Sequence, residues 1–212
     1  ANHHLALALR RESRAGLLGI GAGRGVQLRL LLRSLREDPG RLERLRVVAV
    51  DPDPMNLAVT THLAEALARS LPFTLEVHSA QCLIERIDDA EFRDFAAWLG
   101  PRTAVNAAFT LHHTAHALHD HDFRTRLLAR LRDLFVPMVF TLSEPHANHD
   151  TEMLARRLHE SWRHFGAVFE LIDRSEVPPA HRFVIKEKFF GRELRDIFGT
   201  SDLFRSERHE SF

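Results

Sequence analysis

The chain has 212 residues, 44% apolar and 27% charged, which is enough for one sizeable globular domain with a single core. Its 29 basic and 29 acidic side chains balance, which argues against a chain built as a whole to bind nucleic acid or an anionic membrane. The single cysteine, Cys82, excludes an internal disulfide and favours a cytoplasmic protein, and no apolar run reaches the roughly 18–20 residues of a membrane span.

Apolar runs typical of β-strands alternate along the chain with amphipathic runs typical of helices. We expect strands at Gly16–Ile20, Leu45–Val50, Phe73–His78, Thr103–Phe109 and Val136–Leu142. We expect helices at His3–Arg11, Val26–Arg36, Met55–Ser70, Ala90–Leu99, Arg124–Leu134, Thr151–Ile172 and Pro179–Phe198. This alternation predicts an α/β fold with a mostly parallel central sheet and helices on both faces. No linker stands out, so we expect one domain over residues 1–212.

The first predicted strand ends in a glycine-rich run, Gly19-Ile20-Gly21-Ala22-Gly23-Arg24-Gly25, directly before a helix. Glycines allow a sharp turn and a close approach to a ligand, towards which the helix N-terminus points its amides. The second strand ends in Asp51-Pro52-Asp53, where doubly wound folds place the acid that binds ribose hydroxyls. The run therefore predicts a nucleoside site, with a tight turn that binds no ligand as the alternative.

The spacing of the glycines separates the candidate ligands. No register gives the G-x-G-x-x-G pattern of dinucleotide-binding folds, and no Gly-Lys-Ser/Thr sequence follows as a phosphate loop would require. The remaining pattern, G-x-G-x-G, resembles the first motif of S-adenosylmethionine-dependent methyltransferases.

Ligands of such sheets bind beyond the carboxyl ends of the strands. This rule nominates polar residues or glycines after each predicted strand: Gly21, Gly23 and Gly25; Asp51 and Asp53; Ser79 and Gln81; Asn106, His112 and His113; and Glu144, His146, Asn148 and His149. We expect Gly21, Gly23, Gly25, Asp51, Asp53, Gln81 and Asn106 to bind the cofactor.

From Asn106 onward the chain resembles the GRAS family. The matching segments are Ala104-Val105-Asn106 with Phe109 and Leu111-His112; Thr141 and Glu144 with Ala147-Asn148-His149; Ala167-Val168-Phe169-Glu170 with Ile172-Asp173; Phe190-Gly191-Arg192-Glu193-Leu194-Arg195-Asp196-Ile197; and Glu207-Arg208-His209-Glu210. The resemblance implies a Rossmann-like methyltransferase fold. Plant members are transcriptional regulators, whereas the glycine loop here is similar to that of bacterial members, which implies an S-adenosylmethionine-dependent methyltransferase acting on a small molecule.

The chain departs from these patterns in two ways. Gly19 stands where the methyltransferase motif usually carries an acid that steadies the methionine or loop end of the cofactor. The closing tryptophan segment of the family is missing as well. We therefore expect a fragment without its C-terminal strands and its N-terminal cap.

Methyl transfer from a sulfonium needs a base only where the acceptor must lose a proton. Glu144, His149 and His112 are the candidates for that role, and Asn148 and Arg192 are assigned to substrate binding. Local alternatives are a helix cap at His112 or Asn148, and a buried pair between Arg192 and Glu193.

Two other functions stay open. His112, His116 and His119 share one helical face at a spacing that suits a transition metal, or they form a solvated polar face. The second open function is a non-catalytic scaffold, which binds a ligand or a partner protein in transcriptional regulation. Arginines near 124–132 and 192–208 could serve it, or pair with neighbouring acids. Direct binding to nucleic acid is not expected, because no basic reading helix stands out.

Overall fold

The computed structural model describes residues 1–114, 123–144, 147, 149 and 153–199, and its contacts divide the chain into two compact units. Unit 1 comprises Ala1–Thr110 and Thr125–Ser143, and unit 2 comprises Leu111–Arg124 and Glu144–Phe212. Whether the two units act as one domain, as the sequence suggests, stays a prediction.

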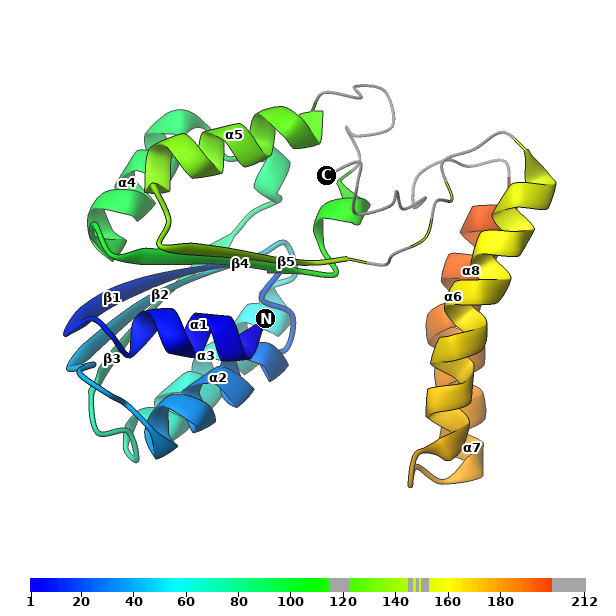
Figure 1. The fold of residues 1–212 in the computed structure, drawn as a ribbon, viewed down its shortest axis with the longest axis horizontal. Helices are drawn as coiled ribbons and strands as arrows, with labels where there is room; N and C mark the ends of the chain where they lie inside the picture. The colour runs from blue at the N-terminus through cyan, green and yellow to red at the C-terminus, as the bar shows by residue number, and fades with distance from the viewer. Residues whose placement is uncertain (115–122, 145–146, 148, 150–152, 200–212) are drawn as a thin grey trace. The chain divides into compact units, whose positions relative to one another are not determined.

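Unit 1 is built on a five-stranded sheet in which every neighbouring pair of strands is parallel (Figure 1). The strands are β1 (Arg14–Ile20), β2 (Arg44–Asp51), β3 (Thr74–Gln81), β4 (Thr103–Ala108) and β5 (Val139–Ser143). Their order in space is β3-β2-β1-β4-β5, so the direction of winding reverses between β1 and β4. This is the order of a Rossmann-like sheet, and the reversal is where such sheets bind ligands. The predicted α/β class is confirmed.

Helices cover both faces of this sheet, as predicted (Figure 1). One face carries α1 (Asn2–Leu9), α2 (Val26–Glu37) and α3 (Pro54–Ala68), and the other carries α4 (Asp89–Leu99) and α5 (Phe123–Phe135). A short turn, η1 (Ile84–Arg86), precedes α4. The core of the first face is made of leucines from α1 and α2 packed on apolar strand residues: Leu5, Leu9, Leu31, Leu32 and Leu35 with Leu17, Leu45, Val47 and Ala104.

Unit 2 contains the short turn η2 (Leu111–His113) and a pair of long helical segments. The first is α6 (Leu154–Arg174); the second runs through α7 (Pro179–Val184), the π-helical η4 (Ile185–Phe190) and α8 (Gly191–Phe198). They pack through Phe165 and Phe169 against Phe190, with ring centroids 6.0 and 6.1 Å apart. Lys186 also binds Asp173, with Nζ 2.6 Å from each carboxylate oxygen.

The bounds of several predicted elements differ from the structure: β3, for example, ends at Gln81, three residues later than predicted. The last predicted helix has the expected extent, but its π-helical turn changes the periodicity, and Phe183 in the turn before it is 66% exposed. β5 begins at Val139, three residues later than predicted, because Val136 has a φ of 41° and Pro137 lacks a backbone donor. In the described part of the chain, no helix combines the length and the apolar character that crossing a membrane requires.

Candidate functional site

The loop between β1 and α2 turns on three glycines in the left-handed region, with φ of 66° at Gly21, 52° at Gly23 and 70° at Gly25. A Cβ on Gly21 would lie 1.9 Å from the Oγ1 of Thr110, so Gly21 is required by packing as well as by its backbone. A Cβ on Gly23 would meet nothing closer than the Gly21 carbonyl oxygen at 4.0 Å. The loop is therefore tight at Gly21 and open at Gly23.

Asp51, the last residue of β2, holds this loop in place through side-chain hydrogen bonds. Its side chain is almost fully buried, and its Oδ2 accepts a hydrogen bond from the Gly23 amide at 2.8 Å. Its Oδ1 accepts from the Asp53 amide at 3.0 Å and from Asn56 Nδ2 at 3.2 Å. A carboxylate offers about four acceptor positions, so these three contacts leave Oδ2 able to accept one more donor.

Asp53 and Gln81 lie at the same edge of the sheet. Asp53 is the N-cap of α3: its Oδ1 accepts from the Met55 amide at 2.8 Å, and Pro54 occupies the first helical position. Gln81 is exposed and stands beside Asp51 in the register of β2 with β3. The structure places both near the loop, and their role as cofactor ligands stays a prediction.

Asn106 of β4 is held by a reciprocal amide pair. Its Nδ2 donates to Gln27 Oε1, and its Oδ1 accepts from Gln27 Nε2, both at 3.0 Å. The same Oδ1 accepts from Thr141 Oγ1 at 2.8 Å. Sequence reasoning nominated Asn106 but missed Gln27, although a residue in the first helical turn after a glycine loop is well placed to face a ligand.

A cavity of about 380 Å³ opens beside the loop, a volume typical of small-ligand sites. Its lining includes Gly19, Gly21, Gly23, Gln27 and Asn106. A Cβ built on Gly19 would have Val48 O at 3.7 Å as its nearest neighbour, which is ordinary van der Waals contact. The position of the missing acid therefore faces this cavity with room for a side chain.

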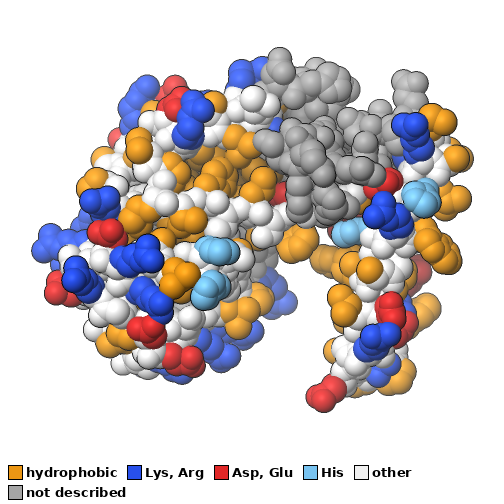
Figure 2. All heavy atoms as spheres, in the orientation of Figure 1, with side chains coloured by type: hydrophobic (Ala, Val, Ile, Leu, Met, Phe, Trp, Pro, Cys, Tyr) orange, Lys and Arg blue, Asp and Glu red, His pale blue; other side chains and the backbone are white. Residues whose placement is uncertain are grey.

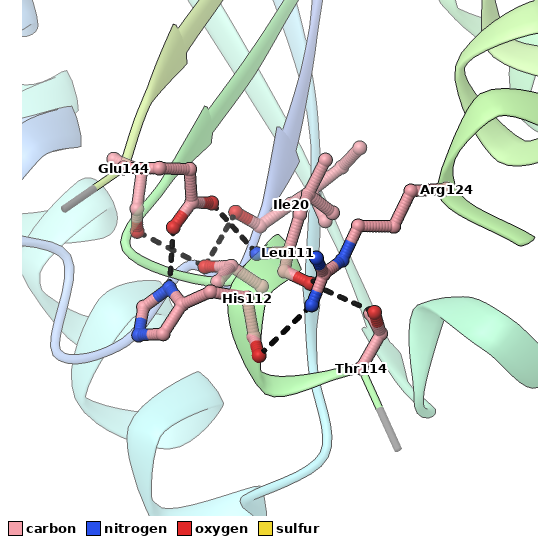
Figure 3. A network of polar contacts seen from close by, with 8 residues as sticks. Ile20, Leu111, His112, Thr114, Arg124 and Glu144 are labelled. Atoms are coloured by element: carbon pink, nitrogen blue, oxygen red, sulfur yellow. Dashed lines mark hydrogen bonds and ion pairs between the residues drawn. The ribbon is translucent and has the colours of Figure 1, made fainter. Parts of the chain in front are cut away.

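In unit 2, Glu144 joins two neighbouring residues of η2 (Figure 3). Its Oε1 accepts from the Leu111 amide at 2.7 Å, and its Oε2 pairs with His112 Nδ1. Arg124 approaches the same turn, with Nε 3.2 Å from Leu111 O and Nη2 3.4 Å from His112 O. Two of the three predicted bases, Glu144 and His112, thus form one buried pair.

His149, the third predicted base, also lies in unit 2 and is 2% exposed. Its ring stacks on Phe165 with centroids 6.2 Å apart. Burial lowers the pKa of His149 from 6.5 to about 4, and the nearby His164 contributes in the same direction. The imidazole is therefore neutral at pH 7, and its low pKa makes it a weaker proton acceptor than an ordinary histidine.

The remaining predictions fall outside what the structure describes. Asn148, His116 and His119 are not among the described residues, and neither is the side chain of Arg192, whose backbone belongs to α8. Within the described residues, no three potential ligands are grouped so that they could hold a metal ion. The described candidates thus form two sets: the cofactor candidates in unit 1, and Glu144, His112 and His149 in unit 2.

Comparison with known protein families shows to which family the chain belongs. The model of the GRAS domain family matches residues 1–212. The chain belongs to the GRAS domain family. Among its relatives, Scarecrow-like transcription factor PAT1 of Arabidopsis thaliana is 26% identical over 219 residues, covering 99% of this chain and 44% of that protein. Scarecrow-like protein 21 of the same plant is 28% identical over 215 residues, covering 99% and 50%. This GRAS chain spans about half the length, or less, of these relatives.

Solved structures that resemble the GRAS chain include two methyltransferases. The methyltransferase domain of bacterial CtHen1-C has a TM-score of 0.44 at 16% identity, covering 79% of this chain and 78% of that one. A SAM-dependent methyltransferase from Thiobacillus denitrificans, in complex with S-adenosyl-L-homocysteine, has a TM-score of 0.43 at 17% identity, covering 92% and 76%. The fold assignment itself rests on the strand order of the sheet.

Proposed function

We propose that this GRAS domain binds S-adenosylmethionine at the loop after β1 and transfers its methyl group to a small-molecule acceptor. The observation that carries the proposal is Asp51, which is buried at the end of β2 and accepts a hydrogen bond from the amide of Gly23, a glycine with open space at its Cβ position. The sulfonium of the cofactor supplies a methyl group that is already activated. The protein then has to align donor and acceptor and exclude water.

The residues present fit the nucleoside end of this cofactor. One acceptor position remains on Asp51 Oδ2 for a ribose hydroxyl, and the missing Cβ of Gly23 allows a ligand to approach the backbone. The amino-acid end fits less well, because Gly19 supplies no carboxylate to its ammonium group. We therefore expect weak but measurable binding.

The base for a hydroxyl or ammonium acceptor is, in this proposal, the pair of Glu144 and His112. The carboxylate of Glu144 orients the His112 ring through its contact with Nδ1. His149 is the secondary candidate, and Asn148 and Arg192 are proposed to orient the substrate. We propose a cytoplasmic location and small-molecule rather than nucleic-acid partners.

A non-catalytic scaffold is the second candidate, favoured by one relative, whose name describes a transcription factor. Such a scaffold could retain the cofactor loop as a ligand sensor or use its surface for a partner protein. Both functions are compatible with a ligand bound at the glycine loop. They differ in whether the bound cofactor loses its methyl group to an acceptor.

Calorimetry with S-adenosylmethionine and with S-adenosylhomocysteine, each titrated into the full chain, tests the binding. Asp51→Ala and Gly23→Trp should abolish the binding heat, whereas Asp94→Ala, at an exposed aspartate of α4, should keep it. Thermal unfolding of each variant separates loss of the site from loss of the fold. No binding by the wild type at millimolar cofactor would overturn the proposal. Binding without formation of S-adenosylhomocysteine across a panel of acceptors would favour the scaffold.

A further inference from the structure

A second cavity, of about 390 Å³, lies at the end of the sheet where the strands begin, opposite the end that carries the glycine loop. It is lined by Arg14 at the start of β1, Arg44 and Arg46 of β2, and Arg102 just before β4, together with Glu12. The strands of unit 1 begin on the left of Figure 1, and Figure 2 shows both basic and acidic side chains at that side. None of these residues belongs to the candidate cofactor site.

The strand register brings like charges together in this cavity. Arg14 and Arg44 are direct partners in the parallel pairing of β1 with β2, so their side chains leave the same face of the sheet side by side. Arg46, two residues further along β2, points to that face as well. Like charges directly opposite one another destabilise a sheet, and an apolar or mixed pair would be the stable choice here.

Carboxylates of the chain balance only part of this charge. Glu76 serves two arginines, with Oε1 3.4 Å from Arg44 Nε and Oε2 3.1 Å from Arg46 Nε. Glu12 lies 3.6 Å from Arg102 Nε. Four guanidinium groups thus share two carboxylates, which leaves an excess of two positive charges.

Two of the arginines differ in how they are held. Arg46 is fixed: its Nη1 donates to Trp98 O at 2.7 Å, and its guanidinium lies over the Trp98 ring, 5.5 Å from the centroid. Arg14 is exposed, and within the described residues no carboxylate forms an ion pair with it. The cavity therefore combines a fixed cation with one that is available to a ligand.

We propose that this cavity binds a phosphorylated small molecule. A phosphate group carries about two negative charges and accepts paired hydrogen bonds from guanidinium groups, which match its geometry better than an ammonium does. The excess of two positive charges and the volume of about 390 Å³ suit one such ligand. The site is separate from the loop at Gly23 and does not depend on the proposed methyl transfer.

Pyrophosphate titrated into the full chain by calorimetry tests the proposal. We expect saturable binding that weakens as salt is added. The double variant Arg14→Ala/Arg102→Ala should weaken it at least tenfold, because both side chains are exposed and the fold should survive their loss. Arg69→Ala, at an exposed arginine after α3 and outside the cavity, is the matched control.

Thermal unfolding gives a second, independent measurement. Without pyrophosphate, Arg14→Thr should unfold at a higher temperature than the wild type, because it removes the like-charge pair with Arg44. Pyrophosphate should raise the unfolding temperature of the wild type more than that of Arg14→Thr.

Three results would overturn the proposal. They are no binding of millimolar pyrophosphate, equal losses in Arg69→Ala and the double variant, and binding to phosphatidic acid vesicles without binding to pyrophosphate. The last would assign the arginines to a lipid surface. Excess S-adenosylhomocysteine should not displace pyrophosphate, which separates this site from the cofactor loop.

Discussion

Gly21 and Gly23 share a left-handed backbone but differ in their surroundings, and this difference can be measured. Alanine at Gly23 costs only the backbone strain, about 1–2 kcal/mol, because its Cβ enters open space. Alanine at Gly21 adds an overlap with Thr110, which we expect to cost about 1–3 kcal/mol more. Urea unfolding of the two variants checks the prediction. Equal losses of stability would show that Thr110 moves aside freely.

Gly19 can be tested by restoring the missing acid. Since a Cβ there makes only ordinary contacts and faces the cavity, Gly19→Asp should fold and place a carboxylate beside the cofactor's amino-acid end. A charge-assisted hydrogen bond of about 1.5–3 kcal/mol corresponds to an affinity gain of roughly tenfold or more. Calorimetry with S-adenosylmethionine measures the gain, and the neutral Gly19→Asn variant is the control. A gain of the same size in Gly19→Asn would show that charge is not the cause.

The sequence predicted the glycine turn and the position of Asp51 at the end of β2 because both follow from local spacing, and their role in cofactor binding stays a prediction. It could not predict which groups hold them, because these contacts join distant parts of the chain. Gln27 and Asn106, for example, are 79 residues apart and meet only once the sheet has formed.

At the scale of elements, all five strands and the helices between them were predictable from hydrophobic patterning, because the central strands are apolar runs buried between two layers of helices. The errors lie where periodicity carries no information. The start of β5 depends on the backbone at Val136 and Pro137, and the π-helical turn over Ile185–Phe190 interrupts the α-helical period.

The amide pair of Gln27 with Asn106 connects the first turn of α2 to β4 by two hydrogen bonds. A double-mutant cycle measures the coupling free energy between these two side chains. Asn106→Leu alone leaves Gln27 and Thr141 without their partner, which we expect to cost about 2–3 kcal/mol. Adding Gln27→Leu should cost less than it does in the wild type, because its partner is already gone. The readout is the free energy of unfolding in urea. Strict additivity would mean that the pair contributes no coupling.

At the scale of the whole molecule, the chain divides where its composition gives no sign of a boundary. Leu111–Arg124 belongs to unit 2 although it lies between segments of unit 1, and no Gly- or Pro-rich linker marks either crossing. Sequence reasoning placed Glu144 and His149 at the same end of the sheet as the cofactor candidates, because it assigned them to the segment after the fifth strand. It had no means of assigning Glu144 and His149 to a separate unit.

His149 makes the stability of the protein depend on pH. Its pKa is about 4 when folded and 6.5 when unfolded, so the unfolded chain binds more protons between these values. Its contribution to the free energy of unfolding, about 3 kcal/mol, is complete above pH 6.5 and is lost as the pH falls towards 4.

His149→Phe removes this titration, so the wild type should lose stability relative to the variant on acidification. Urea unfolding at about pH 7 and pH 4.5 checks it, with the exposed His159→Phe as control. Parallel pH profiles for wild type and His149→Phe would contradict the assignment.

The central place of β1 has a consequence for synthesis on the ribosome. β1 is made well before its second neighbour, β4, which begins at Thr103, roughly 80 residues after Ile20. At about 5–20 residues per second, the ribosome needs roughly 4–16 s to produce that partner. During this interval the apolar edge of β1 is unpaired on the nascent chain. We therefore expect the newly made segment between β1 and β4 to need protection from aggregation until β4 has emerged.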